Sequence, residues 1–360
     1  MNATQATIDL DDTEGLLAAD RDGLLRAAST AGAQVRAAAA ALDEGALDAV
    51  RGDDRVRTVI WVAGRGTAET AGTMLAATFG SWAAAPIVVT ADAPSWIGPL
   101  DVLIVAGDDP GDPALVAAAA SGVRRGARLV VAAPYAGPLR DATAGRVAVM
   151  EPRLPVPDEF GLCRYLAAGL AALQTVDPKL RVDLAALADE LDAEALRNSA
   201  SRELFTNPAK ALVERMSRRR VVLAGDCAAT LALARHGSSV LLRVAHQVVA
   251  AAGLADALIA LRTTGSGLVD PVEALFHDEE IDGPVAERLR VLALTLDAER
   301  TVVASRVAQL DDVDIVGAED VPEGPGASTA PVGVQRAEQQ LAILAVRLEM
   351  AAVYLRLVRG

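Results

Sequence analysis

The sequence contains few of the side chains that most often perform catalysis. Its three histidines are His236, His246 and His277, and its only lysines are Lys179 and Lys210. A mechanism that needs a lysine base or a Schiff base is therefore restricted to two positions. The two cysteines are far apart and show no metal-ligand spacing or disulfide framework, so we interpret them as small buried residues in a reducing compartment. We expect no metal centre and no cofactor.

Aromatic residues are also scarce, at 3% of the chain, whereas hydrophobic residues make up 52% of its 360 positions. The core must therefore consist mainly of Ala, Val and Leu, and the length suits two domains or one large α/β unit. The net charge of −14 and the pI near 4.7 argue against binding to nucleic acid or to acidic membranes. The N-terminus lacks the features of a signal peptide, and the uncharged run 70–91 is interrupted by glycine and proline. We expect a cytoplasmic protein without a membrane or nucleic-acid partner.

Short apolar runs alternate with helical segments through the first half of the chain. Strands are predicted at 57–63, 86–90, 100–106, 128–132 and 146–150, and helices at 68–80, 114–124 and 158–173. This alternation is typical of a parallel sheet that is covered by helices on both faces.

A second series with the same alternation follows. It comprises helices at 207–216, 231–235 and 240–261 (the last with a possible strand near its end), strands at 220–224, 289–296 and 314–316, a mobile loop at 317–333 and a long helix at 335–359. The similarity of Val-Ile-Trp-Val-Ala-Gly to Val-Val-Leu-Ala-Gly suggests an internal duplication. We therefore expect an N-terminal helical segment (1–50), a first α/β domain (51–176), a helical connector (177–206) and a second α/β domain (207–360).

The turn after the first strand has features of an anion site. Gly64 and Gly66 allow the backbone to approach a ligand closely, and the N-terminus of the following helix favours a negative charge. Arg65 adds donors for a phosphate or carboxylate, Thr67 is placed to cap the helix, and Glu69 suits its first turn. An ordinary strand-to-helix turn without a ligand is the alternative, because short glycine motifs are weak evidence.

A second turn follows the strand at 100–106 and is acidic. Gly107 is followed by Asp108, Asp109 and Asp112. Such carboxylates can hold a cation or act as acid and base, but they are more often turn and cap residues, and together they would repel a phosphate.

For each histidine in the second half, a purely structural role is the alternative to a functional one. His246 lies one turn after Arg243, and on one helical face the two can meet a sugar phosphate or a carboxylate, although a core or interface histidine is the commoner case. His236 precedes Gly237 at a predicted helix end, which favours a simple role at the helix C-terminus. His277, beside three acidic residues, is expected at the surface.

The arrangement resembles the double sugar-isomerase (SIS) fold of bacterial and archaeal bifunctional phosphoglucose/phosphomannose isomerases. It is similar to the actinobacterial TobH-type branch, which is found with mannose-phosphate metabolism. The segments that carry the resemblance are 64–67 (first glycine loop), 207–210 (opening of the second half), 276–278 with Arg288, and 350–356 (terminal helix). The resemblance implies two flavodoxin/Rossmann-like parallel-sheet α/β domains with a long C-terminal helix, a homodimer, and a sugar phosphate as ligand.

The sequence departs from this family where the chemistry takes place. The Ser/Thr-rich phosphate loop is replaced by 105–110, which has no hydroxyl. The family's Glu-Asn-x-Lys helix start appears as Arg243-Val-Ala-His246, its His-Asn-Glu has no counterpart in 253–261, and its terminal lysine is missing. Isomerisation through an enediol needs a carboxylate base, which an arginine cannot replace.

We therefore expect a catalytically degenerate homologue that binds a hexose 6-phosphate or a partner enzyme and regulates hexose- or mannose-phosphate metabolism. The candidate ligand-binding residues are Gly64, Arg65, Gly66, Thr67, Gly107 and Arg243. Two alternatives stay open. The first is an active phosphoglucose/phosphomannose isomerase that uses Glu69, His236 and His246 as substitutes. The second is a purely structural partner of a mannose-pathway enzyme.

Overall fold

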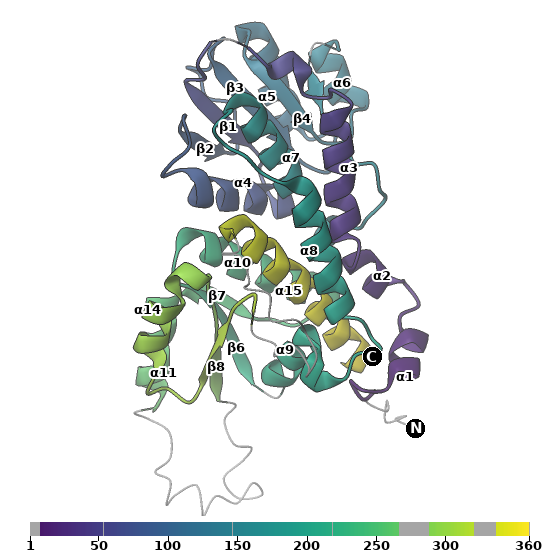
Figure 1. Cartoon of the computed structure of the whole chain (residues 1–360), viewed down its shortest axis with the longest axis vertical. Helices are drawn as coiled ribbons and strands as arrows, with labels where there is room; N and C mark the ends of the chain where they lie inside the picture. The colour runs from purple at the N-terminus through teal and green to yellow at the C-terminus, as the bar shows by residue number, and fades with distance from the viewer. Residues whose placement is uncertain are drawn as a thin grey trace, which may run out of the picture.

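The chain folds into two α/β halves stacked end to end, as the computed structural model shows (Figure 1). It describes residues 8–52, 54–145, 147–217, 219–265, 288–319 and 336–359. His277 and the segment 276–278 lie outside the described residues, as does most of the loop expected at 317–333. No helix in the described ranges is both long and apolar enough to cross a membrane.

The first half contains a parallel sheet in the order β2-β1-β3-β4-β5. Its strands are β1 (Thr58–Val62), β2 (Ile87–Thr90), β3 (Asp101–Ala106), β4 (Arg128–Ala132) and β5 (Ala148–Val149). This is the strand order of the flavodoxin-like doubly wound fold, which changes direction between β1 and β3. The two central strands β1 and β3 are buried along their whole length, as their continuous apolar runs predict.

Alternate residues of β1 face different helical layers. Val59 and Trp61 join a large core with α4 (Gly66–Phe79) and α7 (Leu162–Val176). Ile60 and Val62 instead join a smaller core with α5 (Pro113–Arg125) and α6 (Gly137–Thr143) on the opposite face. The period of two along the strand therefore assigns one helical layer to each face of the sheet.

The second half repeats this winding with a parallel sheet in the order β7-β6-β8-β9. Its strands are β6 (Arg220–Gly225), β7 (Ala250–Gly253), β8 (Leu289–Leu294) and β9 (Val313–Val316). The helices are α9 (Pro208–Met216), α10 (Ala228–Ala245) and α15 (Ala337–Arg359) on one face, and α11 (Leu254–Gly265) and α14 (Asp297–Val307) on the other. The expectation of two parallel-sheet domains with a long C-terminal helix is thus confirmed.

The boundaries predicted for the helices at 231–235 and 240–261 are wrong. One helix, α10, spans 228–245 and ends at His246, whose left-handed backbone (φ +52°) stops it. Residues 250–253 then form β7, although Ala-Ala-Ala-Gly has little intrinsic preference for a strand. Pairing with β6 supplies the backbone hydrogen bonds, so the tertiary environment overrides the local propensity.

The helical segments outside the two sheets connect the halves. Before the first sheet lie α1 (Thr13–Ala19), α2 (Leu24–Ala28), α3 (Ala31–Asp43) and the 3₁₀ turn η1 (Asp48–Val50). The connector contains α8 (Leu184–Arg197) and η3 (Leu204–Thr206), and η2 (Asp158–Phe160) precedes α7. Helices α3 and α8 run side by side along the molecule (Figure 1). The exact boundaries of the four expected segments stay a prediction.

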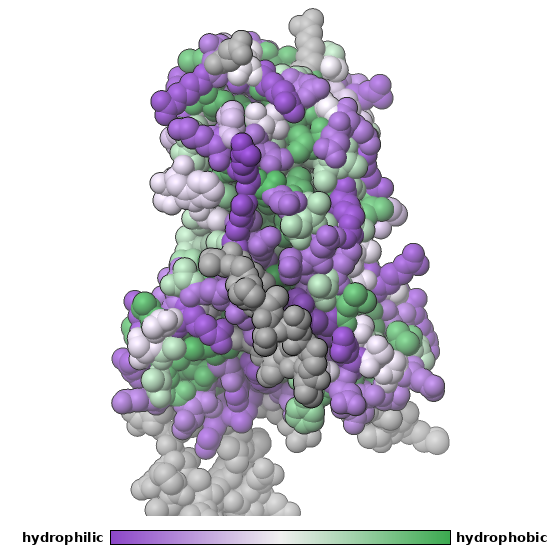
Figure 2. Space-filling view, in the orientation of Figure 1, coloured by the Kyte–Doolittle hydropathy of each residue, from purple (hydrophilic) through white to green (hydrophobic). Residues whose placement is uncertain are grey.

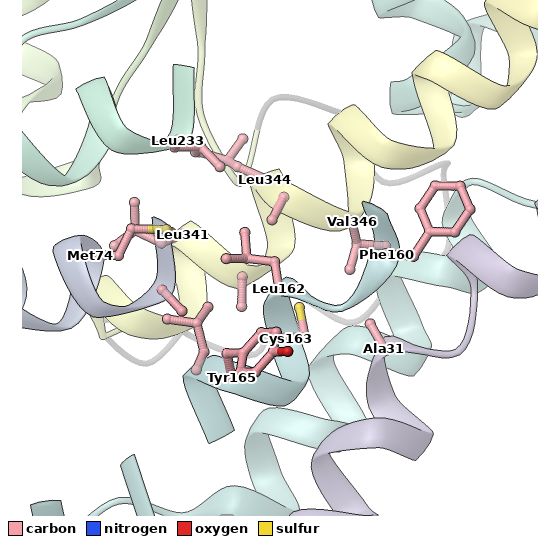
Figure 3. Packing of buried hydrophobic residues seen from close by; sticks show 14 of the residues in the cluster. Ala31, Met74, Phe160, Leu162, Cys163, Tyr165, Leu233, Leu341, Leu344 and Val346 are labelled. Carbon is pink, nitrogen blue, oxygen red and sulfur yellow. The ribbon is translucent and has the colours of Figure 1, made fainter. Parts of the chain in front are cut away.

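The C-terminal helix α15 lies in the large core that the two halves share. Eighteen of its 23 residues are buried, four of them polar or charged (Glu338, Gln340, Arg347 and Glu349), so protein surrounds the helix on nearly every side. Figure 3 shows Leu341 and Leu344 of this helix beside Met74 of α4 and Leu233 of α10. The face seen in Figure 2, by contrast, is mostly hydrophilic.

One buried ion pair attaches α15 to the connector. Arg347 donates from Nε to Oε1 of Glu194 (2.8 Å) and from its terminal nitrogens to the carbonyls of residues 317 and 318 (both 2.7 Å). Both side chains are at most 2% exposed. Burial alone would raise the pKa of Glu194, but the Arg347 guanidinium holds that pKa below its ordinary value.

We predict that Arg347→Ala lowers the free energy of unfolding by about 3 kcal/mol, because it leaves the Glu194 carboxylate buried with only Arg197 and Asn198 as partners. The folded pKa of Glu194 is depressed, so the stabilisation is complete above the unfolded pKa of about 4.3 and is lost as the pH falls. Urea unfolding at pH 7 and at pH 4 measures both effects.

The matched control is Arg356→Ala on the same helix, which removes an exposed pair with Asp22 and should cost about 0–1 kcal/mol. Equal losses in the two variants would contradict a structural role for the buried pair.

Candidate functional site

A cavity of about 440 Å³ opens where β1 and β3 end, between the first half and α10. It is lined by Gly64, Arg65, Gly66, Thr67, Ala106, Gly107, Asp108, Asp109, Asp112, Leu115, Asp158, Ser239 and Arg243. The carboxyl ends of β1 and β3 flank the point where the strand order reverses, which is where doubly wound folds bind ligands. All six predicted ligand-binding residues therefore lie around one cavity, although they come from both halves of the chain.

The N-terminus of α4 is open towards this cavity. Gly66 has φ +68°, a left-handed conformation that glycine adopts without strain, and the helix begins there. The Arg65 side chain makes no capping hydrogen bond. A Cβ built at Gly64 or Gly66 would meet no atom within 4 Å, so the space beside both glycines is empty. The N–H groups of this helical turn are available to an anion.

The expected capping role of Thr67 is wrong. Because Gly66 already starts the helix, Thr67 lies inside the first turn instead of before it. Its hydroxyl donates to the carbonyl of Asp158 at 3.2 Å, and this bond attaches α4 to η2 at the edge of the cavity.

Two arginines face the cavity from opposite halves, and each is paired with a carboxylate. Arg65 lies 3.4 Å from Asp112 and its side chain is 77% exposed. Arg243 on α10 donates to Glu159 on η2 at 3.0 Å. An entering anion would have to replace these carboxylates or share the guanidinium groups with them.

The acidic turn mainly organises its own surroundings. Asp108 accepts hydrogen bonds from Arg164 and Tyr165, both at 2.5 Å. Asp109 and Asp112 each accept from the backbone N–H two residues later (2.8 and 2.9 Å), and Asp112 caps α5. These are the turn and cap roles that the sequence left open as the commoner alternative. Within the described part of the chain, no group of three acidic, histidine or cysteine side chains is placed to hold a metal ion.

Asp158 is the acidic residue that sequence reasoning missed. It lines the cavity from η2. Burial, and to a lesser extent repulsion from Asp108, raise the pKa of its carboxyl, whereas the positive charges of Arg243 and Arg164 lower it in part. Ser239 of α10 was missed as well. In the sequence Asp158 marks only a predicted helix start, and its position at the cavity depends on how η2 packs against α4.

The three candidate catalytic side chains do not come together. Glu69 is an exposed residue of α4 outside the cavity lining. His236 is 3% exposed in the core, with Nε2 2.9 Å from Oε1 of Glu349 on α15. His246 is an exposed residue beyond the end of α10. The cavity is therefore lined by none of the three.

The prediction that His236 ends a helix is wrong, because His236 and Gly237 lie inside α10. A Cβ at Gly237 would come within 2.7 Å of Leu223 on β6 and 3.1 Å of Leu348 on α15. This glycine allows close packing of α10 against the sheet and α15, and it does not mark a C-cap.

The equivalent turn of the second half is closed by its own side chains. Cys227 caps α10 by accepting from the N–H of Thr230, whose hydroxyl in return accepts from the N–H of Cys227 at 3.2 Å. Asp226 pairs with Arg306 at 2.5 Å. The two strand–turn–helix units thus differ, since the helix N-terminus is open in the first half and capped in the second.

Comparison of the sequence with protein-family models and with curated proteins finds no match. The fold, however, matches solved structures over almost the whole chain. A provisionally assigned phosphosugar isomerase of Clostridium difficile has a TM-score of 0.60 at 12% identity, covering 94% of this chain and 93% of its own. A glucose-6-phosphate isomerase-like protein of Thermus thermophilus has a TM-score of 0.54 at 19% identity, and the match covers 98% of this chain and 96% of its own. Tagatose-6-phosphate ketose/aldose isomerase of Escherichia coli has a TM-score of 0.54 at 15% identity, and the match covers 94% of this chain and 90% of its own.

We predict that sulfate, whose charge is constant in this range, binds the cavity more tightly as the pH falls from about 7 towards the ordinary aspartate pKa of about 3.9, with the gain beginning above that value. The raised pKa of Asp158 means that its carboxyl takes up a proton before an ordinary aspartate does, which removes a negative charge beside the anion. Isothermal titration at fixed ionic strength measures the effect.

The control is Asp158→Asn, which should bind sulfate more tightly at pH 7.5 and lose much of the pH dependence. An unchanged slope in this variant would show that Asp158 is not the titrating group.

Proposed function

Starting from the two-domain SIS fold that this chain has, we propose that the cavity binds a sugar phosphate of the hexose 6-phosphate class without isomerising it. The observation that carries this proposal is one cavity that combines an open helix N-terminus and two arginines but is not lined by the expected glutamate or histidines. The protein then acts as a catalytically degenerate homologue that regulates hexose- or mannose-phosphate metabolism.

The geometry at α4 supports a phosphate at the β1 edge of the cavity. The uncapped N–H groups after Gly66 favour a negative charge, and the guanidinium of Arg65 lies beside the same turn. Arg243 faces the same space from α10. A volume of about 440 Å³ is within the range of small-molecule sites. The aspartates can accept hydrogen bonds from sugar hydroxyls.

The disposition of the acidic groups argues against efficient isomerisation. Transfer of the proton between two carbons through an enediol needs a carboxylate base within hydrogen-bond reach of that proton. Asp108 is engaged by Arg164 and Tyr165, and Asp112 caps α5. Glu69 and His236, the substitutes considered for an active enzyme, lie outside the cavity lining.

Asp158 favours a second candidate function, an active isomerase that uses an aspartate base. Its carboxyl lines the cavity and has a raised pKa, which brings a carboxylate closer to the range suited to proton transfer. The two functions differ in turnover, so a direct assay separates them.

We predict that saturation with glucose 6-phosphate or mannose 6-phosphate raises the unfolding temperature of the protein. A ligand at about 100 times its dissociation constant adds about 2.7 kcal/mol to the stability. Arg65→Ala and Arg243→Ala should each reduce this shift, because each removes a donor beside the proposed phosphate.

The control is Arg153→Ala, which removes an exposed pair with Glu44 away from the cavity and should leave the shift intact. Arg65 and Arg243 variants that retain the full shift would place the ligand elsewhere.

We further predict that coupled assays with fructose 6-phosphate and mannose 6-phosphate show no turnover above background. Robust turnover that disappears in Asp158→Asn would favour the active isomerase, because only that reading requires a base at this position. Robust turnover that survives this substitution would contradict both functions as stated here.

The homodimer and the association with a mannose-pathway enzyme remain part of this proposal, as does the TobH-type branch. The cavity supports a ligand-binding role over a purely structural one, since a structural partner needs no such site.

A further inference from the structure

The amino ends of the strands of the first sheet carry a basic surface on an otherwise acidic protein. The segments 51–57, 82–86, 96–101 and 124–128 lead into β1, β2, β3 and β4. Together they contain six arginines and three aspartates, a net charge of +3, whereas the whole chain carries −14. The cavity lies at the carboxyl ends of β1 and β3, so these four segments, which we call the amino-end surface, lie at the opposite end of the sheet.

Direct contacts join the four segments. Three arginine side chains each donate to a backbone carbonyl of a neighbouring segment: Arg55 to Ala84 (3.3 Å), Arg57 to Trp96 (3.1 Å) and Arg128 to Asp54 (2.9 Å). A Cβ built at Gly126 would lie 3.7 Å from the Pro99 ring, which places the turn before β4 beside the segment before β3. The amino-end surface is therefore continuous.

Most of the positive charge on this surface is not balanced locally. Arg51 pairs with Asp48, and Arg57 pairs with Asp101. In the described ranges, no carboxylate lies within 4.0 Å of the charged nitrogens of the other four arginines, which are Arg55, Arg124, Arg125 and Arg128. Four guanidinium groups are thus left for a partner of opposite charge.

Two of the three tryptophans of the chain are exposed on the same surface. The exposed fractions are 58% for Trp82 and 49% for Trp96, whereas Trp61 is buried at 1%. Both exposed rings are held in place, because Trp82 packs on Phe79 (ring centroids 5.0 Å apart) and the Arg57 guanidinium lies 5.6 Å from the centroid of Trp96. Tryptophan and arginine are enriched at protein interfaces, and side chains that are already held lose little entropy on binding.

The charge of this surface restricts the kind of partner that fits it. A two-fold contact between copies of the chain would place the four unbalanced arginines against the same four, which repel. A head-to-tail contact between copies extends into an open chain unless a ring closes. Nucleic acids and anionic membranes present negative charge over a wide area, which the acidic remainder of this chain opposes.

We propose that the amino-end surface binds a different protein through a segment that has acidic side chains beside apolar ones. The carboxylates pair with the four unbalanced arginines, and the apolar side chains cover Trp82 and Trp96. This inference goes beyond the proposed function and does not depend on the ligand of the cavity. Because the two sites lie at opposite ends of the first sheet, a partner bound here leaves the cavity open.

The test uses a synthetic, fluorescein-labelled peptide of about twelve residues built from Glu-Glu-Leu repeats, titrated with the full chain at low salt. We expect saturable binding in fluorescence anisotropy, weakened about threefold or more when the salt is raised to about 0.3 M. Unlabelled peptide should change the tryptophan emission through Trp82 and Trp96, since Trp61 is already buried. A peptide with lysine in place of glutamate should not bind.

Variants assign the binding to the surface. The double variant Arg124→Gln/Arg125→Gln removes two of the unbalanced charges and should weaken the acidic peptide about fivefold. Trp96→Ala should also weaken it and reduce the change in emission. The control is Arg202→Gln/Arg235→Gln, which makes the same charge change at exposed arginines outside the first half and should leave the affinity unchanged.

Three results would overturn the inference. The first is the absence of saturable binding of the acidic peptide. The second is an affinity that is the same in Arg124→Gln/Arg125→Gln as in the unchanged protein. The third is tighter binding of single-stranded DNA, or of vesicles of phosphatidylcholine and phosphatidylserine, that this double variant abolishes, because the surface then serves a nucleic acid or a membrane. Sugar-phosphate binding in the cavity is measured separately, so the proposed function stands or falls independently.

Discussion

The arrangement of this protein depends on the burial of one helix, α15, between its two halves. The helix packs against α10 of the second half and reaches α4 and α7 of the first, so its apolar side chains belong to a core that is continuous across the molecule. Helices α4 and α10 lie against each other as part of the same core. The cavity depends on this packing. Its second-half residues, Ser239 and Arg243, reach the glycine turn of the first half only because α10 is held against α4. Its charged groups are positioned by hydrophobic packing that lies elsewhere.

The two halves repeat one supersecondary pattern but use it differently. In each, a central strand leads into a short turn and a helix follows directly: β1 ends at Val62 with Gly64 in the turn, and β6 ends at Gly225. In the first half a left-handed Gly66 and an uncapped helix leave backbone N–H groups for a ligand. In the second, the Thr230 hydroxyl and the Cys227 thiol accept from the N–H groups of Cys227 and Thr230, so two backbone groups at this helix start are satisfied within the protein. A backbone amide that bonds to its own chain is no longer available to an anion, so the helix N-terminus is open in the first half and capped in the second.

Much of the fold could be predicted because it follows from local patterns. Continuous apolar strands such as β1 and β3 indicate a parallel sheet, and the regular alternation with helices indicates two doubly wound halves. The predictions failed where long-range contacts override the local signal. Strand β7 is made of small residues that pair because β6 is beside them, and Gly237 packs against Leu223 and Leu348 where the sequence suggested a helix end. In both cases the deciding partner is distant in sequence, so no window around the residue contains the information.

The sequence by itself determined the glycine turn, its arginine and the acidic turn after β3, because these depend on residue type and on neighbours in the chain. It also indicated that the acids were more often turn and cap residues, which is how Asp109 and Asp112 are used. Only the tertiary structure decided that Arg243 and Asp158 share a cavity with Arg65, and that His236 is buried against Glu349. The reason is physical: a side chain's chemistry is fixed by its identity, but its charge state, its exposure and its neighbours are set by how the two halves pack together.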